Sequence, residues 1–79
     1  MTWGPFAGDL DPAERTARLR CLRLAVKLLV GPRGVETRHA LLVAEIDPNA
    51  DTLAAAQVEF DRLSPLDRRR VLASYCEVV

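Results

Sequence analysis

The chain has 79 residues, of which 49% are hydrophobic and 28% charged, and its 11 acidic side chains balance its 11 Lys and Arg. This length allows one domain with a modest core, and the composition excludes disorder over most of the chain. No apolar run is long enough for a membrane span, and residues 1–10 lack the pattern of a secretory signal, so we expect a cytoplasmic protein.

Residues 1–10 are expected to form an irregular N-terminal arm, followed by a single helical domain over residues 11–79. The arm carries Trp3 and Phe6, half of the aromatic residues of the chain. Large aromatic side chains dominate the energetics of both cores and interfaces. Two alternatives therefore stay open: the arm folds back onto the domain, or its two rings anchor a partner.

A first helix is predicted over residues 12–30. Asp11 precedes Pro12, which fits the first helical position, and Asp11 can cap the free amides, with Glu14 completing a capping box. Gly31, followed by proline, supplies a left-handed C-terminal residue and a helix breaker.

The second half of this helix, residues 19–30, is apolar around most of its circumference. Its only charged residues, Arg20, Arg23 and Lys27, fall together in a band roughly 60° wide on a helical wheel. This pattern places the helix at the centre of the domain. Leu24 and Leu28 lie on the flank opposite Leu19, Val26 and Val30, so either the chain's own helices or a partner must cover them.

A second helix is predicted over residues 35–46. We expect its core face to include His39, with the ring at the edge of the face donating to a backbone carbonyl. The other members of that predicted core face are Val35, Leu42, Val43 and Ile46.

The third and fourth helices are predicted over residues 51–63 and 65–79. Ser64 and Pro65 give the fourth helix a cap-and-proline start. With the first two helices, they predict an all-α fold, a compact small bundle of four helices. Their apolar stripes comprise Leu53, Ala56, Phe60 and Leu63 in the third helix, and Val71, Leu72, Tyr75, Val78 and Val79 in the fourth.

The residues that carry chemistry in enzymes are scarce. His39 is the only histidine, and no group of His, Cys, Asp or Glu has the spacing of metal ligands. Cys21 and Cys76 are 55 residues apart and are expected to be reduced thiols. We therefore expect a protein that is not an enzyme and has no metal, cofactor or small-molecule substrate.

The zero net charge hides a segregation of charges along the chain. Residues 15–38 carry a net +6 and residues 45–61 a net −5. Either these segments neutralise each other within the fold, or the basic face meets an acidic partner. A nucleic-acid-binding regulator that uses the first helix or the Arg68–Arg70 cluster is the alternative function, although a sequence pI near 6.6 is low for that class.

Together these features favour a small protein–protein interaction module, such as an adaptor, an inhibitor or an assembly subunit. Its partner would be another protein or a second copy of the chain. The composition, rich in Arg, Ala and Leu and poor in Lys, resembles that of proteins from GC-rich bacteria or their phages. The candidate interface residues are Trp3, Phe6, Arg20, Arg23, Leu24, Lys27 and Leu28.

Overall fold

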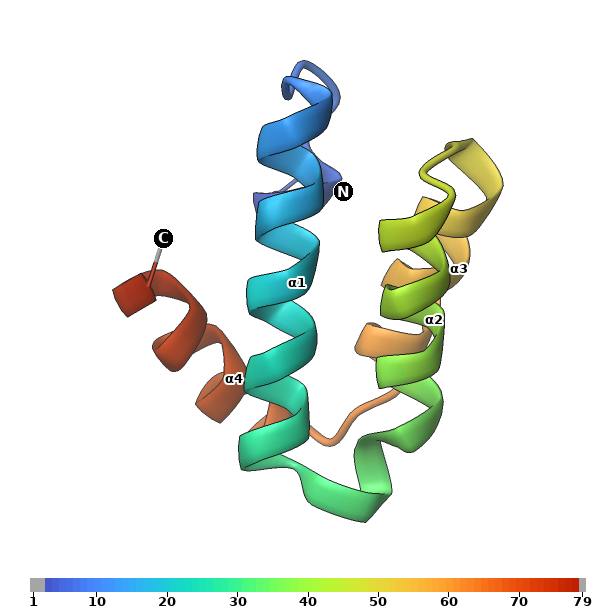
Figure 1. Ribbon diagram of the computed structural model, residues 1–79. Helices are drawn as coiled ribbons and strands as arrows, with labels where there is room; N and C mark the ends of the chain where they lie inside the picture. The colour runs from blue at the N-terminus through green and yellow to red at the C-terminus, as the bar shows by residue number, and fades with distance from the viewer. Residues whose placement is uncertain (1–2, 79) are drawn as a thin grey trace.

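Four α-helices joined by short connections make up most of the chain (Figure 1). The computed structural model describes residues 3–78, and side chains over residues 3–75. No strand occurs in that part of the chain, and the predicted all-α bundle is confirmed. Cys76, Val78 and Val79 lie outside the residues whose side chains are described. The elements are η1 (Gly4–Phe6), α1 (Pro12–Leu29), η2 (Gly31–Gly34), α2 (Val35–Ile46), α3 (Ala50–Asp61) and α4 (Pro65–Val78).

Local signals at the helix ends explain these boundaries. Asp11 Oδ2 accepts a hydrogen bond from the amide of Ala13 at 3.1 Å, and Gly31 ends α1 with a φ of +70°. The predicted capping box at α1 is wrong, because the carboxylate of Glu14 accepts a hydrogen bond from Arg18 instead. The described chain places a capping box at the start of α3, between Asn49 and Thr52.

Helix α1 lies at the centre, between α4 on one side and the pair of α2 and α3 on the other (Figure 1). Its side chains Leu19, Leu22 and Val26 are fully buried. The predicted stripe of α3 also faces the core. The other buried apolar residues are Phe6, Ala25, Val30, Leu41, Ala44, Ala56, Phe60, Leu63, Val71 and Tyr75.

The predicted core face of α2 is wrong. The residues that α2 buries are Thr37, Leu41 and Ala44, with Ala40 half-buried beside them. Small side chains let the backbones of neighbouring helices approach closely, and the hydroxyl of Thr37 donates to the carbonyl oxygen of Glu59 on α3 at 3.1 Å. The predicted set, Val35, His39, Leu42, Val43 and Ile46, is exposed instead.

Gly34 sets this rotation of α2 about its own axis. Gly34 is buried directly before α2, and a Cβ atom there would lie 2.7 Å from Val26 Cγ1 and 3.1 Å from Val30 Cγ1. Only a residue without a side chain lets this turn of chain lie against α1. Since residues 34, 37, 41 and 44 share one helical face, seating Gly34 inward also turns Leu41 and Ala44 inward.

The N-terminal arm folds back onto the bundle, as the first of the two alternatives predicted. Phe6 is buried, and the ring of Trp3 lies 5.3 Å from that of Phe6 between ring centroids. Trp3 also lies 5.4 Å from Phe60 of α3 and 6.2 Å from Tyr75 of α4. The arm therefore completes the core between α3 and α4.

The contact at Gly34 predicts a large effect of one methyl group. Gly34→Ala is expected to lower the free energy of unfolding by about 1–3 kcal/mol, because the added carbon overpacks the core against Val26. Gly8→Ala is the matched control, since nothing lies within 4 Å of that position, and its effect should stay within about 0.5 kcal/mol. Urea denaturation followed by circular dichroism measures both, and equal effects would contradict the assignment.

Candidate protein-binding surface

An apolar ridge runs along the outside of α2. We call Val35, His39, Leu42 and Ile46 the α2 ridge; their successive spacings are four, three and four residues. Val35 is 54% exposed, Leu42 37% and Ile46 75%, and His39 is exposed between them. This spacing is that of the seam along which two helices pack in a coiled coil. The ridge thus has the pattern of a helix–helix contact but no helix on it in the described chain.

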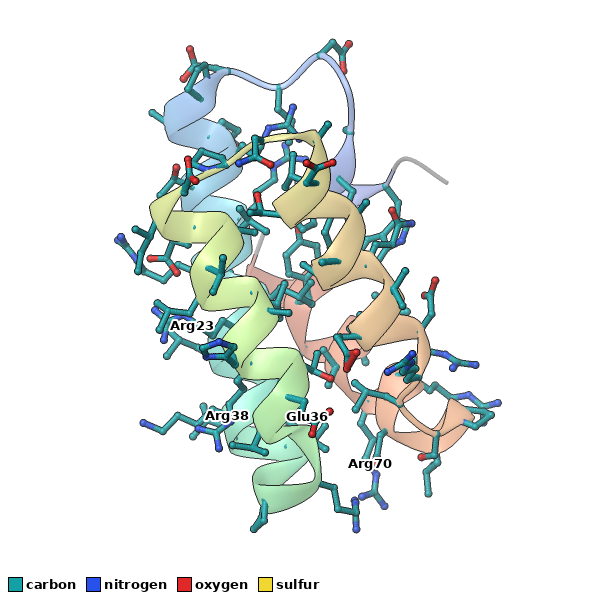
Figure 2. The ribbon with its side chains drawn as sticks, turned by 90° about the vertical axis from the view of Figure 1, so that its right-hand side faces the viewer. Arg23, Glu36, Arg38 and Arg70 are labelled. Atoms are coloured by element: carbon teal, nitrogen blue, oxygen red, sulfur yellow. The ribbon has the colours of Figure 1, made fainter. Side chains whose placement is uncertain are left out.

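A cationic groove separates the α2 ridge from α1. Figure 2 shows Arg23 and Arg38 on the same side of α2. The Nε of Arg38 is buried without a hydrogen-bond partner, and Lys27 forms no ion pair within the described residues. Arg38 and Lys27 therefore bring uncompensated positive charge to the groove. The residues that line it are Arg23, Lys27, Val35, Arg38, His39 and Leu42.

A flank with two carboxylates, Glu36 and Glu59, borders the ridge on its other side; we call it the acidic flank, although Arg33 and Arg62, each paired with a carboxylate, line its end. Glu36 points toward α3, away from Arg38 (Figure 2). A second groove there is lined by Val35, Glu36, His39, Ala40 and Glu59. Glu59 is paired with Arg62 at 2.9 Å, whereas Glu36 is exposed and has no ion pair among the described side chains. Unpaired charge of opposite sign thus lies on the two sides of one apolar ridge.

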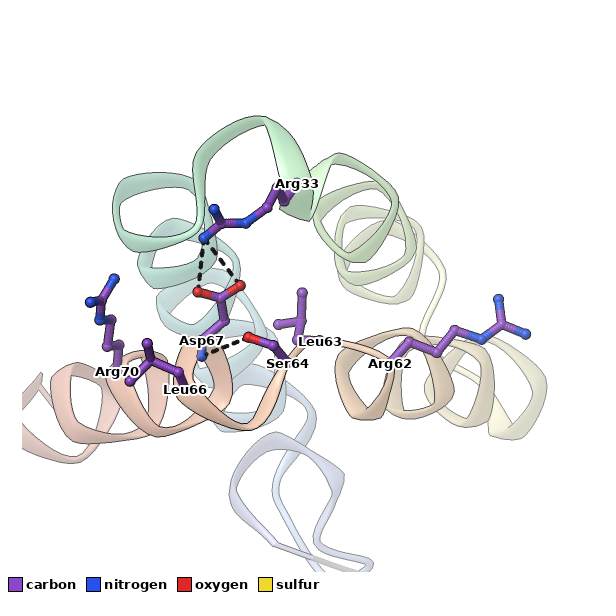
Figure 3. A pocket seen from close by; sticks show the side chains of 7 residues that line it. All are labelled: Arg33, Arg62, Leu63, Ser64, Leu66, Asp67 and Arg70. Atoms are coloured by element: carbon purple, nitrogen blue, oxygen red, sulfur yellow. Dashed lines mark hydrogen bonds and ion pairs between the residues drawn. The ribbon is translucent and has the colours of Figure 1, made fainter.

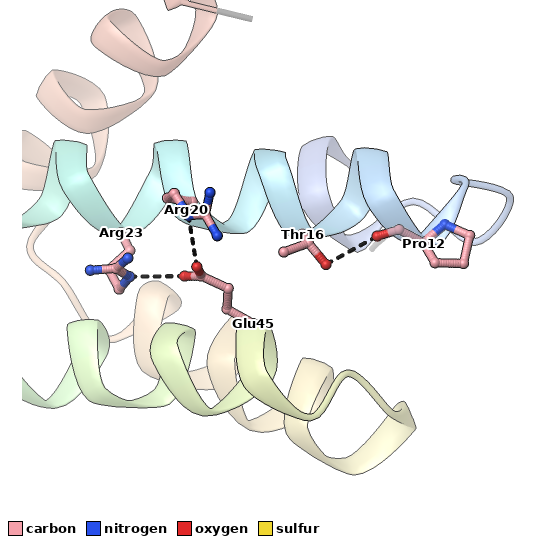
Figure 4. Close-up of polar contacts among 5 residues, drawn as sticks. All are labelled: Pro12, Thr16, Arg20, Arg23 and Glu45. Atoms are coloured by element: carbon pink, nitrogen blue, oxygen red, sulfur yellow. Dashed lines mark hydrogen bonds and ion pairs between the residues drawn. The ribbon is translucent and has the colours of Figure 1, made fainter.

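Arg20 and Arg23 are engaged inside the molecule. Both donate to Glu45 of α2, at 2.8 and 3.0 Å, across the seam between α1 and α2 (Figure 4). Burial of the Glu45 carboxylate opposes its ionisation, but the hydrogen bonds and charges of the two arginines outweigh burial and lower its pKa from the ordinary 4.5. The predicted neutralisation of the basic helix by the acidic segment therefore occurs at Glu45.

The remaining predicted interface residues divide into two groups. Leu24 is 43% exposed and Leu28 80%, so α4, whose Ser74 and Tyr75 line a groove with them, covers that flank of α1 only in part. Phe6 is buried, and Trp3 is partly buried and packs against the core. Sequence reasoning missed Arg38 and assigned the α2 ridge to the core. The four-three-four spacing of the ridge residues indicates a helix-packing face, but it does not say whether the helix that packs there belongs to this chain or to a partner.

His39 does not have the environment predicted for it. Its ring is exposed on the ridge and makes no hydrogen bond within the described residues. Because α2 turns Thr37, Leu41 and Ala44 inward, position 39 lies on the opposite, outer face of the helix.

A separate hollow of about 550 Å³ lies where η2 meets the start of α4 (Figure 3). Its centre is the buried carboxylate of Asp67, which accepts hydrogen bonds from Arg33 at 2.9 and 3.2 Å. Arg33 and Asp67 thereby tie η2 to α4 and satisfy each other. Arg62 and Arg70 line the hollow on opposite sides of this pair.

Comparisons with known protein families, curated proteins and solved structures find no match to this chain. Among the described residues, no three His, Cys, Asp or Glu side chains are grouped as metal ligands. None of the helices in that same region combines the length and the apolar character that crossing a membrane requires.

The Glu45 cluster predicts a pH-dependent contribution to stability. Because the pKa of Glu45 is lower in the folded chain, its stabilisation is complete above the ordinary value of 4.5 and is lost as the pH falls through the lowered value. Glu45→Gln should cost about 1 kcal/mol at neutral pH, since Arg20 is largely exposed. Urea denaturation at several pH values should show the difference from the native chain shrinking below pH 4.5; a constant difference would contradict the prediction.

The exposure of the α2 ridge predicts which face of α2 tolerates polar residues. Ile46→Asn is expected to change the free energy of unfolding by less than about 0.5 kcal/mol. Leu41→Ala should cost about 2–5 kcal/mol, because Leu41 is fully buried. Thermal denaturation of dilute protein compares the two variants, and a larger loss for Ile46→Asn would show that the ridge is part of the core.

Proposed function

We propose that this protein is a non-enzymatic protein-binding module that binds its partner through the α2 ridge and the cationic groove beside it. The observation that carries the proposal is the exposure of three branched apolar side chains, Val35, Leu42 and Ile46, in one helical row. Contiguous exposed apolar surface rimmed by polar residues is typical of protein interaction sites.

The shape and chemistry of this surface favour a protein partner. The ridge is the convex outer side of a helix, whereas small ligands are held in concave sites that bury most of their surface. An amphipathic helix placed on the ridge would bury its own apolar face there, and its carboxylates could pair with Arg38 and Lys27. Adaptors, inhibitors and assembly subunits all use surfaces of this kind.

The structure leaves fewer cationic side chains available for binding nucleic acid than the sequence contains. Arg20 and Arg23 are paired with Glu45, and Arg68 donates to the carbonyl oxygens of Asp61 and Leu63. These contacts hold the bundle together and compete with phosphate. Binding to DNA or RNA stays a prediction whose mark would be a steep loss of affinity with added salt.

Photo-crosslinking on the ridge tests the proposed function. The photoreactive residue p-benzoylphenylalanine, introduced at Ile46, should give a discrete covalent adduct in an extract of the source cells. The same residue at Ala73 is the matched control, since Ala73 is exposed on α4, on the far side of α1 from α2. Gel electrophoresis and mass spectrometry identify the adducts.

The expected result is an adduct at position 46 and none at position 73. An adduct with a second copy and an adduct with another protein both support the proposed function, and their masses distinguish them. The absence of an adduct at Ile46, and at Leu42 tested in the same way, would overturn it.

A further inference from the structure

We propose that the partner of the α2 ridge is a second copy of this chain, with the two α2 helices side by side and parallel about a two-fold axis along them. This inference rests on the proposed function and adds the identity of the partner and its orientation. It depends on the opposite charges of the two flanks of the ridge.

Symmetry decides which flanks meet when two copies pack ridge to ridge. If the two-fold axis runs along the helices, the helices are parallel and the left flank of one copy faces the right flank of the other. If the axis runs across them, the helices are antiparallel and like flanks face each other. The cationic groove of one copy therefore meets the acidic flank of the other only in the parallel dimer.

The unpaired charges of Lys27 and Glu36 lie at the same height along α2, near Val35, on opposite flanks of the ridge. Lys27 and Val35 line the same groove, and Glu36 follows Val35 directly on the opposite flank. In the parallel dimer, Lys27 of each copy faces Glu36 of the other, and both charges lack an ion pair within the described chain. Arg38 meets the same acidic flank.

The apolar seam fits the parallel arrangement as well. Residues spaced four, three and four apart meet their own counterparts when two helices run parallel and in register. Leu42 then packs on Leu42, and Ile46 on Ile46. A helix of 12 residues is only about 18 Å long, so the flanks of α1 and α3 must add to the contact. Because the contact is small, we expect a weak dimer, with a dissociation constant on the order of 10–100 µM.

Sedimentation equilibrium of the purified full chain between about 5 and 500 µM tests whether the dimer exists, the range being chosen to bracket that constant. We expect a monomer–dimer equilibrium that Leu42→Glu abolishes. Leu66→Glu is the matched control, because Leu66 is also an exposed leucine, 53% accessible, but lies on α4. Circular dichroism confirms that each variant is folded.

Charge reversal then tests the orientation. Lys27→Glu and Glu36→Lys should each raise the dissociation constant about three- to tenfold, and the double variant should restore it, because opposite charges meet again. In an antiparallel dimer, Lys27 and Glu36 of the two copies lie at opposite ends of the α2 ridge and do not face each other, so the single reversals would not weaken association and the double variant would restore nothing. A loss of affinity that the double variant reverses therefore distinguishes the parallel orientation.

Disulfide trapping provides an independent readout in a Cys21→Ala, Cys76→Ala background. Ile46→Cys should oxidise to a covalent dimer, because position 46 meets itself in the parallel arrangement. In the antiparallel dimer, two residues at position 46 lie about 16 Å apart, too far for a disulfide, and position 46 meets position 35 instead.

Two results would overturn the inference. A strict monomer over the whole concentration range shows that the partner is not a second copy, and an adduct with another protein at Ile46 would then leave the proposed function standing. A dimer that forms a mixed disulfide between Val35→Cys and Ile46→Cys chains, but none from Ile46→Cys alone, shows the antiparallel orientation.

Discussion

The contact of Gly34 with Val26 and Val30 fixes the orientation of α2, and the candidate surface depends on that orientation. With Gly34 against α1, the next turns of α2 bring Thr37, Leu41 and Ala44 inward, so the larger branched residues point to solvent. Packing of α3 over the small inner residues holds this arrangement from the other side. The same glycine that closes the core thus creates the exposed ridge.

The distribution of ion pairs determines which charges remain exposed beside the α2 ridge. Glu45 and Asp67, two largely buried carboxylates, are each paired with arginine and join elements of the fold. Lys27 and Glu36 remain without ion pairs in the described chain, on opposite sides of α2. A chain with no net charge therefore still carries an electrical asymmetry across its apolar ridge, and such an asymmetry selects among orientations of a partner more strongly than it adds affinity.

The helices could be predicted from sequence because their ends carry local signals, such as Asp11 before Pro12 and Ser64 before Pro65. The core face of α2 could not, because α2 carries two apolar stripes on opposite faces. The stripe with the larger side chains appeared to be the core, and only the tertiary contact at Gly34 decides for the smaller one. Of the candidate interface residues predicted on α1, Arg23 and Lys27 line the cationic groove, whereas Arg38, which the sequence did not single out, joins them through its position beside α1.

The packing of the N-terminal arm has a spectroscopic consequence. Trp3 is the only tryptophan of the chain, and its ring lies among Phe6, Phe60 and Tyr75. Its intrinsic fluorescence therefore reports the junction of the arm with α3 and α4, while far-ultraviolet circular dichroism reports the helices. Coincident melting of the two signals would indicate a single cooperative unit, and an earlier change in fluorescence would reveal that the arm detaches before the bundle unfolds.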